Sequence, residues 1–148
     1  MKTLKLGIAG LGHVGCGLVD LVQRQDSLRL PGKVEIAGIT ARNRSRNRPV
    51  DVEDYEWFDD AARLAADDSV NVFVELIGGS DGPAKVAVET ALKSGKAVIT
   101  ANKALIAMHG QELAELAREQ GVDLLFEAAV AGGVPVVRVL RDSLAGVD

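Results

Sequence analysis

The feature that most constrains this sequence is a glycine-rich turn close to its start. Residues 4–9 form a short apolar run, and Gly10, Gly12 and Gly15 follow it with the spacing G-x-G-x-x-G. Beyond the turn, apolar residues recur at helical spacing, namely Val14, Leu18, Leu21 and Val22. A strand, a tight turn and a helix in this order are the context that the dinucleotide-binding fingerprint requires.

Each glycine of the turn has an expected role. Gly10 would allow the chain to turn sharply, Gly12 would let a pyrophosphate approach the backbone, and Gly15 would let the helix pack close to the strand. The helix would then present its free N–H groups and positive dipole end to the phosphates. The alternative is a glycine-rich turn that binds nothing. We favour nucleotide binding because the turn lies between a clear strand and a clear helix.

Strand and helix patterns alternate along the chain, which predicts an α/β fold with a doubly wound, mainly parallel, Rossmann-like sheet. Ligands bind such sheets beyond the carboxyl ends of the strands. A second glycine turn, Gly78-Gly79, follows the third expected strand at this edge, and we expect it to contact the cofactor. The expected strands cover residues 4–9, 33–40, 70–77, 97–100 and 123–127. The expected helices cover 14–25, a short stretch from Asp59 or Asp60 to Ala66, a helix from Pro83 that Gly95 ends, and 105–120 with a break near Gly110.

Composition narrows the class of protein further. Hydrophobic residues make up 47% of the chain and aromatic residues only 3%, which suits an aliphatic sheet covered by helices on both faces. The net charge of −4, from 17 basic and 21 acidic residues, predicts no nucleic-acid or membrane partner. No apolar stretch reaches the roughly 18 residues of a spanning helix, and no signal peptide is visible. With a single cysteine, we expect a cytoplasmic protein.

The end of the second expected strand bears on the choice of dinucleotide. An NAD site usually carries an acidic residue there to hold the ribose hydroxyls, but residues 40–44 read TARNR. Arg42 or Arg44 could instead pair with a 2′-phosphate, which favours NADP and leaves NAD open. For Arg46 and Arg48 we expect solvated side chains in a basic loop that contact nothing.

Four blocks of the sequence together resemble homoserine dehydrogenases. They are residues 10–15 (GLGHVG), 75–79 (ELIGG), 100–105 (TANKAL) and 126–135 (FEAAVAGGVP). The blocks occur in order and span almost the whole chain. The last two are specific, whereas the glycine fingerprint occurs in many families. The last two blocks also contain the residues, TANK and EAAVAGG, that distinguish this sequence from other dehydrogenases of the same architecture.

The resemblance implies an oxidoreductase that interconverts L-homoserine and L-aspartate 4-semialdehyde with NAD(P), in threonine and methionine biosynthesis. It implies that His13 and Val14 line the pyrophosphate loop and that Lys103 lies beside the nicotinamide and the reacting carbon. It also implies a monovalent cation such as sodium around Glu127, Val130, Gly132 and Val134. Hard cations prefer oxygen ligands, which backbone carbonyls and a carboxylate supply.

The resemblance also implies a division into domains. Residues 1–134 would form the NAD(P)-binding domain, and residues 135–148 would begin a helix that leads to a substrate-binding domain absent from this chain. We therefore expect a truncated chain rather than a naturally short one, with little turnover of its own. Homodimers would form in the full-length protein. The alternative is a stand-alone NADP-binding sensor or regulatory module without catalysis, which a stop codon after residue 148 would favour.

Several side chains admit a purely structural interpretation. Lys103 could be a surface lysine that opens a helix, although a helix N-terminus disfavours cations. Cys16 is more plausible as a small residue beside the pyrophosphate than as a nucleophile. We expect Glu75 to be structural and His109 to be a surface residue without a partner. Glu127 could cap a helix instead of binding an ion.

Overall fold

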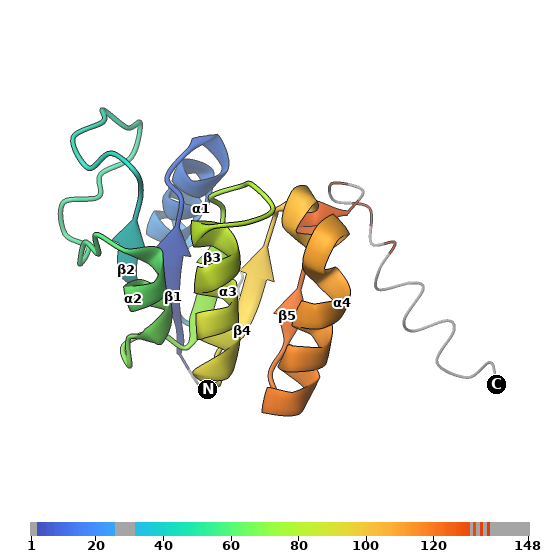
Figure 1. Ribbon diagram of the computed structural model, residues 1–148. Helices are drawn as coiled ribbons and strands as arrows, with labels where there is room; N and C mark the ends of the chain where they lie inside the picture. Colours follow the sequence, from blue (N-terminus) through green and yellow to red (C-terminus); the bar gives the residue numbers. More distant parts are fainter. Residues whose placement is uncertain (1–2, 26–31, 131, 133, 135, 137–148) are drawn as a thin grey trace.

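The strands of this protein form one parallel sheet whose order places β1 near its middle. The computed structural model describes residues 3–25, 32–130, 132, 134 and 136, and its sheet has the order β2-β1-β3-β4-β5 (Figure 1). All four strand pairs are parallel. The strands are β1 (Leu4–Ala9), β2 (Val34–Thr40), β3 (Val72–Glu75), β4 (Ala97–Thr100) and β5 (Leu124–Leu125). The strand order reverses between β1 and β3, so a ligand crevice is expected at their carboxyl ends.

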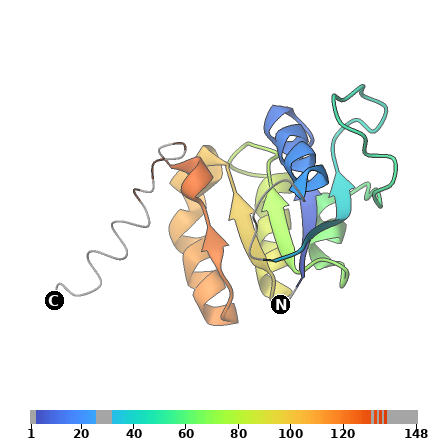
Figure 2. The same ribbon diagram turned by 180° about the vertical axis from the view of Figure 1, so that it is seen from behind.

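Helices cover both faces of the sheet. The helix α1 (His13–Gln23) lies on one face, and α2 (Ala61–Ala66), α3 (Pro83–Lys93) and α4 (Lys103–Gln120) lie on the other (Figures 1 and 2). A short 3₁₀ turn, η2 (Glu127–Ala129), follows β5. The expected doubly wound, Rossmann-like α/β fold is therefore confirmed.

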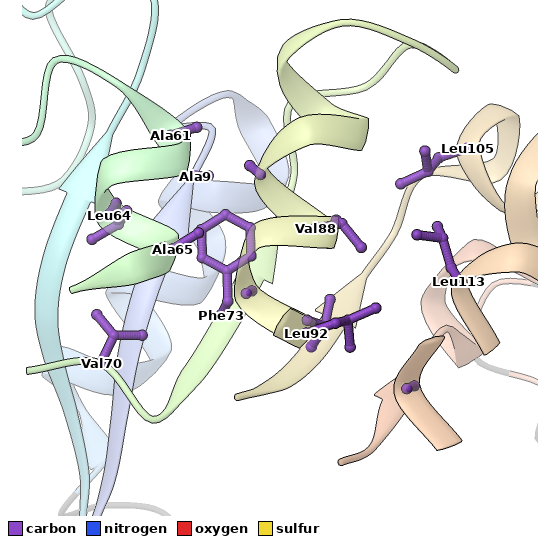
Figure 3. Packing of buried hydrophobic residues seen from close by; sticks show 14 residues of the cluster. Ala9, Ala61, Leu64, Ala65, Val70, Phe73, Val88, Leu92, Leu105 and Leu113 are labelled. Atoms are coloured by element: carbon purple, nitrogen blue, oxygen red, sulfur yellow. The ribbon is translucent and has the colours of Figure 1, made fainter. Parts of the chain in front are cut away.

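The core consists of two apolar layers, one on each face of the sheet. On the face of α2 and α3, Phe73 is fully buried and packs among aliphatic side chains such as Leu64 and Val88 (Figure 3). On the face of α1, Ile8 and Val19 are fully buried. Successive strand residues point to opposite faces, so strands buried on both sides become continuous apolar runs.

The boundaries of the elements follow local capping. The short helix α2 begins after Asp60, whose carboxylate accepts a hydrogen bond from the Arg63 amide at 2.9 Å. Helix α4 begins at Lys103, because the Asn102 side chain caps it. The expected break near Gly110 is wrong, since α4 is continuous over 18 residues. A helical glycine costs about 1 kcal/mol, and the buried side chains on either side of Gly110 offset that cost.

The third and fifth strands are shorter than expected. β3 covers only Val72–Glu75 and β5 only two residues. The helix expected over residues 135–148 lies outside the described residues, apart from Val136. Within the described ranges, no helix is both long enough and apolar enough to cross a bilayer.

The packing of Phe73 predicts a large effect of its removal. We expect Phe73→Ala to lower the free energy of unfolding by about 3–5 kcal/mol, because it leaves a cavity beneath α2 and α3. Urea denaturation followed by circular dichroism measures the change. Val86→Ala, at a side chain that is 53% exposed on α3, is the matched control and should change stability by less than about 0.5 kcal/mol. Equal losses in the two variants would contradict this account of the core.

Candidate functional site

The turn between β1 and α1 requires glycine at two positions. Gly10 has a φ of +107°, and a Cβ atom there would lie 2.4 Å from the Leu76 carbonyl oxygen. A Cβ atom at Gly15 would lie 2.0 Å from the Gly10 carbonyl oxygen. Both contacts are far too short for a side chain, so Gly15 allows α1 to begin directly against the end of β1, and Gly10 allows the turn to pass close to the chain after β3. This agrees with the roles expected of them in a dinucleotide-binding turn.

The start of α1 is open at the position where a side chain of Gly12 would lie. Gly12 is the N-cap residue, no side chain caps the helix, and its first turn contains no acidic residue. A Cβ atom added at Gly12 would meet nothing within 4 Å among the described residues. The first N–H groups of a helix lack intrahelical partners, and they bind anions when no side chain satisfies them. The turn therefore fits a diphosphate.

Two cavities adjoin this turn on different sides. The larger, of 440 Å³, is lined by Gly12, His13 and the first turns of α1, and by residues 46–50 of the loop after β2. The smaller, of 150 Å³, is lined by Val14 together with residues from the ends of β3 and β4, namely Leu76, Ile77, Gly78, Ala101 and Asn102. A dinucleotide whose diphosphate lies over the turn would have one half on each side.

A buried carboxylate connects the ends of β3 and β4. Glu75 is fully buried at the last position of β3. Its Oε1 atom accepts hydrogen bonds from the amides of Ile77 at 2.7 Å and Gly78 at 3.1 Å, and its Oε2 atom accepts one from the Thr100 hydroxyl at 2.6 Å. The Asn102 side-chain amide also donates to Oε1, at 3.5 Å, so both carboxyl oxygens of Glu75 have donors. The expected structural role of Glu75 agrees with these contacts, which fix the backbone of the second glycine turn.

Asn102 extends the same network to α4. Its amide nitrogen donates to the Gly79 carbonyl at 2.7 Å, and its side-chain oxygen accepts from the Leu105 amide at 3.1 Å. Its backbone N–H donates to the Thr100 hydroxyl at 3.0 Å. Thr100 and Asn102 belong to the TANKAL block, but no role for either was predicted from the sequence. Two polar residues at the end of a buried strand could have indicated one.

Lys103 is thereby held at the first position of α4. Its side chain is exposed, and it makes no hydrogen bond or ion pair with the described residues. Its neighbour Asn102 lines the smaller cavity, so Lys103 directly follows a residue of that cavity's wall. A cation at a helix N-terminus is unfavourable by itself, and a ligand that carries negative charge would relieve that cost.

The arginines after β2 differ in their surroundings. Arg42 is exposed directly beyond the strand, and Arg46 lines the larger cavity. The guanidinium groups of Arg44 and Arg48 lie over the Trp57 ring, at 5.5 and 5.4 Å from its centroid. The expectation that Arg48 is a solvated side chain without contacts is wrong, because its guanidinium group also donates to backbone carbonyls of its own loop.

His109 and Cys16 both have partners. The His109 Nε2 atom lies 3.0 Å from a carboxylate oxygen of Asp81, and Nδ1 lies 3.6 Å from one of Glu112. The prediction of a partnerless histidine is therefore wrong, and His109 ties the loop before α3 to α4. Hydrogen bonds from the Ser80 hydroxyl and from His109 lower the pKa of Asp81. The Cys16 thiol is buried and donates to the Leu11 carbonyl at 3.5 Å, as suits a packing residue.

The residues expected around a cation follow β5. Glu127 begins η2, Val130 is its C-cap residue, and Gly132 and Val134 lie further along the chain. No group of three or more histidine, cysteine or acidic side chains in the described part of the chain could hold a metal ion. A cation here would depend on backbone carbonyls and one carboxylate, and such oxygen donors suit a hard ion such as sodium.

Comparisons with known proteins identify the family of this site. The family described as "Homoserine dehydrogenase, NAD binding domain" matches residues 10–127. The homoserine dehydrogenase of Pseudomonas aeruginosa is 42% identical over 147 residues, which cover 97% of this chain and 33% of that protein. The chain thus spans about a third of the length of the curated relatives it matches.

Solved structures agree with this assignment. The homoserine dehydrogenase of Thiobacillus denitrificans superposes with a TM-score of 0.85 at 33% identity, over 97% of this chain and 34% of that one. A hyperthermophilic archaeal homoserine dehydrogenase in complex with NADPH gives a TM-score of 0.81 at 26% identity, over 98% and 50% of the two chains. The match of the family over residues 10–127, which contain both glycine turns and Lys103, shows that this chain belongs to the homoserine dehydrogenase NAD-binding domain family.

Proposed function

We propose that this chain is the cofactor-binding part of an enzyme that interconverts L-homoserine and L-aspartate 4-semialdehyde. The observation that carries the proposal is the open, uncapped start of α1 behind a turn that admits only glycine at two positions. Relatives named homoserine dehydrogenase extend well beyond the length matched here. The remainder of such an enzyme would supply the substrate-binding residues.

The dinucleotide would bind across the end of the sheet. The first turn of α1, from Gly12 to Gly15, would donate its N–H groups to the diphosphate. Within this turn, His13 lines the larger cavity and Val14 the smaller one. Gly78 and Gly79, both at a φ of +86°, would present the turn after β3 to the nicotinamide half. We propose NADP as the preferred dinucleotide, because residues 40–44 carry arginines where an NAD site usually carries an acidic residue.

Lys103 is the proposed catalytic residue of this chain. A bound nicotinamide would supply the hydride acceptor for the carbinol carbon of homoserine, or in reverse the hydride donor for the aldehyde, while the hydroxyl proton would pass to a base in the remainder of the enzyme. A fixed positive charge at Lys103 would stabilise the negative charge that develops on the substrate oxygen. The network of Glu75, Thr100 and Asn102 would hold the start of α4, and with it Lys103, in place before substrate arrives.

Three further features belong to this proposal. A sodium-like ion would bind near Glu127, Val130, Gly132 and Val134, next to the point where the chain leaves β5. The full-length enzyme would be a cytoplasmic homodimer in the biosynthesis of threonine and methionine. These features rest on the resemblance of the sequence blocks and on the oxygen-only donor set after β5.

The proposed diphosphate site makes a direct prediction for Gly12. Gly12→Val should weaken NADP+ binding by at least about tenfold, because the new side chain occupies the space through which the diphosphate approaches. The melting temperature should change little, since that space is open and the φ of Gly12 is −80°. Calorimetric titration of the 148-residue chain measures the affinity. Ala114→Val, an addition on the exposed surface of α4, is the control, and equal affinities of the two variants would exclude this binding mode.

The proposed role of Lys103 predicts that its removal impairs catalysis and leaves cofactor binding nearly unchanged. In a fusion of this chain to the remaining part of a curated relative, Lys103→Ala should lower kcat by about 10²–10³ through the loss of charge stabilisation. The dissociation constant for NADP+ should stay within severalfold of its original value. Lys93→Ala, at an exposed lysine on α3, should leave kcat unchanged. An active Lys103→Ala enzyme would assign the catalytic charge to another residue.

A further inference from the structure

The loop after β2 is held in shape by one of its own arginines. The Arg48 Nη2 atom donates to the Asn43 carbonyl at 2.6 Å. Its Nη1 atom donates to the carbonyls of Arg46 at 2.9 Å and Arg44 at 3.1 Å. One guanidinium fork therefore closes residues 43–48 into a ring. A lysine could not reproduce this geometry, because its ammonium group is a compact point charge without a planar fork.

The ring is anchored to the sheet through Trp57. The segment around Trp57 pairs with the edge of β2: the Ile39 amide donates to the Glu56 carbonyl, and the Phe58 amide donates to the Ile39 carbonyl, both at 2.9 Å. Trp57 also packs against the apolar layer beneath α1. The guanidinium groups of Arg44 and Arg48 lie over its indole ring. These cation–π contacts attach the loop to the sheet through Trp57.

The fixed loop concentrates positive charge beside the glycine turn. Residues 41–50 contain four arginines and no acidic residue. The loop lies at the same end of the sheet as the turn between β1 and α1 (Figures 1 and 2). Arg46 lines the larger cavity together with Gly12 and His13, and Arg42 lies two residues after Thr40, the last residue of β2. Four like charges repel one another, so without the bonds of Arg48 the loop would open and the charges would separate.

We propose that Arg48 is a positioning residue that sets selectivity for a dinucleotide with a phosphate monoester on its adenosine ribose. This inference rests on the proposed binding of a dinucleotide at the glycine turn. Arg48 acts through the backbone of residues 43–46, which it holds so that Arg46 stays in the wall of the larger cavity, where the ribose end of the ligand would lie. A loop ordered before binding loses less entropy when the phosphate arrives. NAD+ lacks that phosphate and gains little from the ordered loop.

Calorimetric titrations of the 148-residue chain with NADP+ and NAD+ test the proposal. The unsubstituted chain should bind NADP+ at least about tenfold more tightly than NAD+, as expected of a charge-assisted phosphate contact. Arg48→Lys keeps the charge but loses the fork, so its affinity for NADP+ should fall about tenfold. Its affinity for NAD+ should change by less than about twofold. The control Arg118→Lys, at an exposed position of α4, should alter neither affinity.

The outcomes are distinguishable. Equal losses for both nucleotides, or no loss for either, would overturn the role of Arg48 and leave the proposed function standing. An unsubstituted chain that binds NAD+ as tightly as NADP+ would overturn both the role of Arg48 and the proposed preference for NADP, and would leave dinucleotide binding at the glycine turn standing. If that chain binds neither nucleotide, the proposed function itself fails. Should Arg48→Lys unfold the chain, Trp57→Leu provides a second test, because it removes the ring on which Arg44 and Arg48 lie. Its affinity for NADP+ should fall about tenfold, while its affinity for NAD+ should change by less than about twofold. Trp57→Phe, which keeps a ring, should retain the preference for NADP+.

Discussion

The site depends on a single buried carboxylate, that of Glu75. It lies at the carboxyl end of β3 and accepts hydrogen bonds from the turn that follows its own strand and from the hydroxyl at the end of β4. A buried polar group is tolerated only when hydrogen bonds replace those it made with water. Removing any donor would therefore be costly, and this keeps the turn after β3 and the start of α4 in one arrangement. The residue nearest the proposed chemistry, Lys103, takes its position from this network.

The glycine turn and the carboxylate network perform complementary tasks at one edge of the sheet. Gly15 lets the start of α1 lie against the Gly10 carbonyl, and Gly10 lets the turn pass close to the Leu76 carbonyl after β3. The uncapped N–H groups of α1 would provide the proposed site for negative charge. The network holds the adjacent turn and an exposed cation on the other side of the strand-order reversal. Because parallel strands end at the same edge, the pairing of the strands is enough to bring together segments that are far apart in the sequence.

The fold and the glycine turn could be predicted from the sequence because their signals are local. Apolar runs, helical spacing and turn glycines each depend on neighbouring residues, and the bounds of β1 and β4 follow from them alone. The contacts of Glu75 with Thr100, of His109 with Asp81 and of Arg48 with Trp57 could not be predicted in this way. Glu75 and Thr100 are 25 residues apart, as the hydrogen bond between them shows, and no periodicity relates them. The break expected near Gly110 does not occur, because the tertiary packing of α4 offsets the low helix propensity of glycine.

The central claim is that the edge formed by residues 12–15 and the turn after β3 binds a dinucleotide through its diphosphate. A titration of the ¹⁵N-labelled chain with NADP+, followed by NMR, tests this claim residue by residue. The account predicts that the largest amide shifts occur at Gly12, His13, Val14 and Gly15, with further shifts at Gly78 and Gly79. Saturating NADP+ that leaves these amide signals in place, or shifts only residues on α3 and the far end of α4, would contradict it.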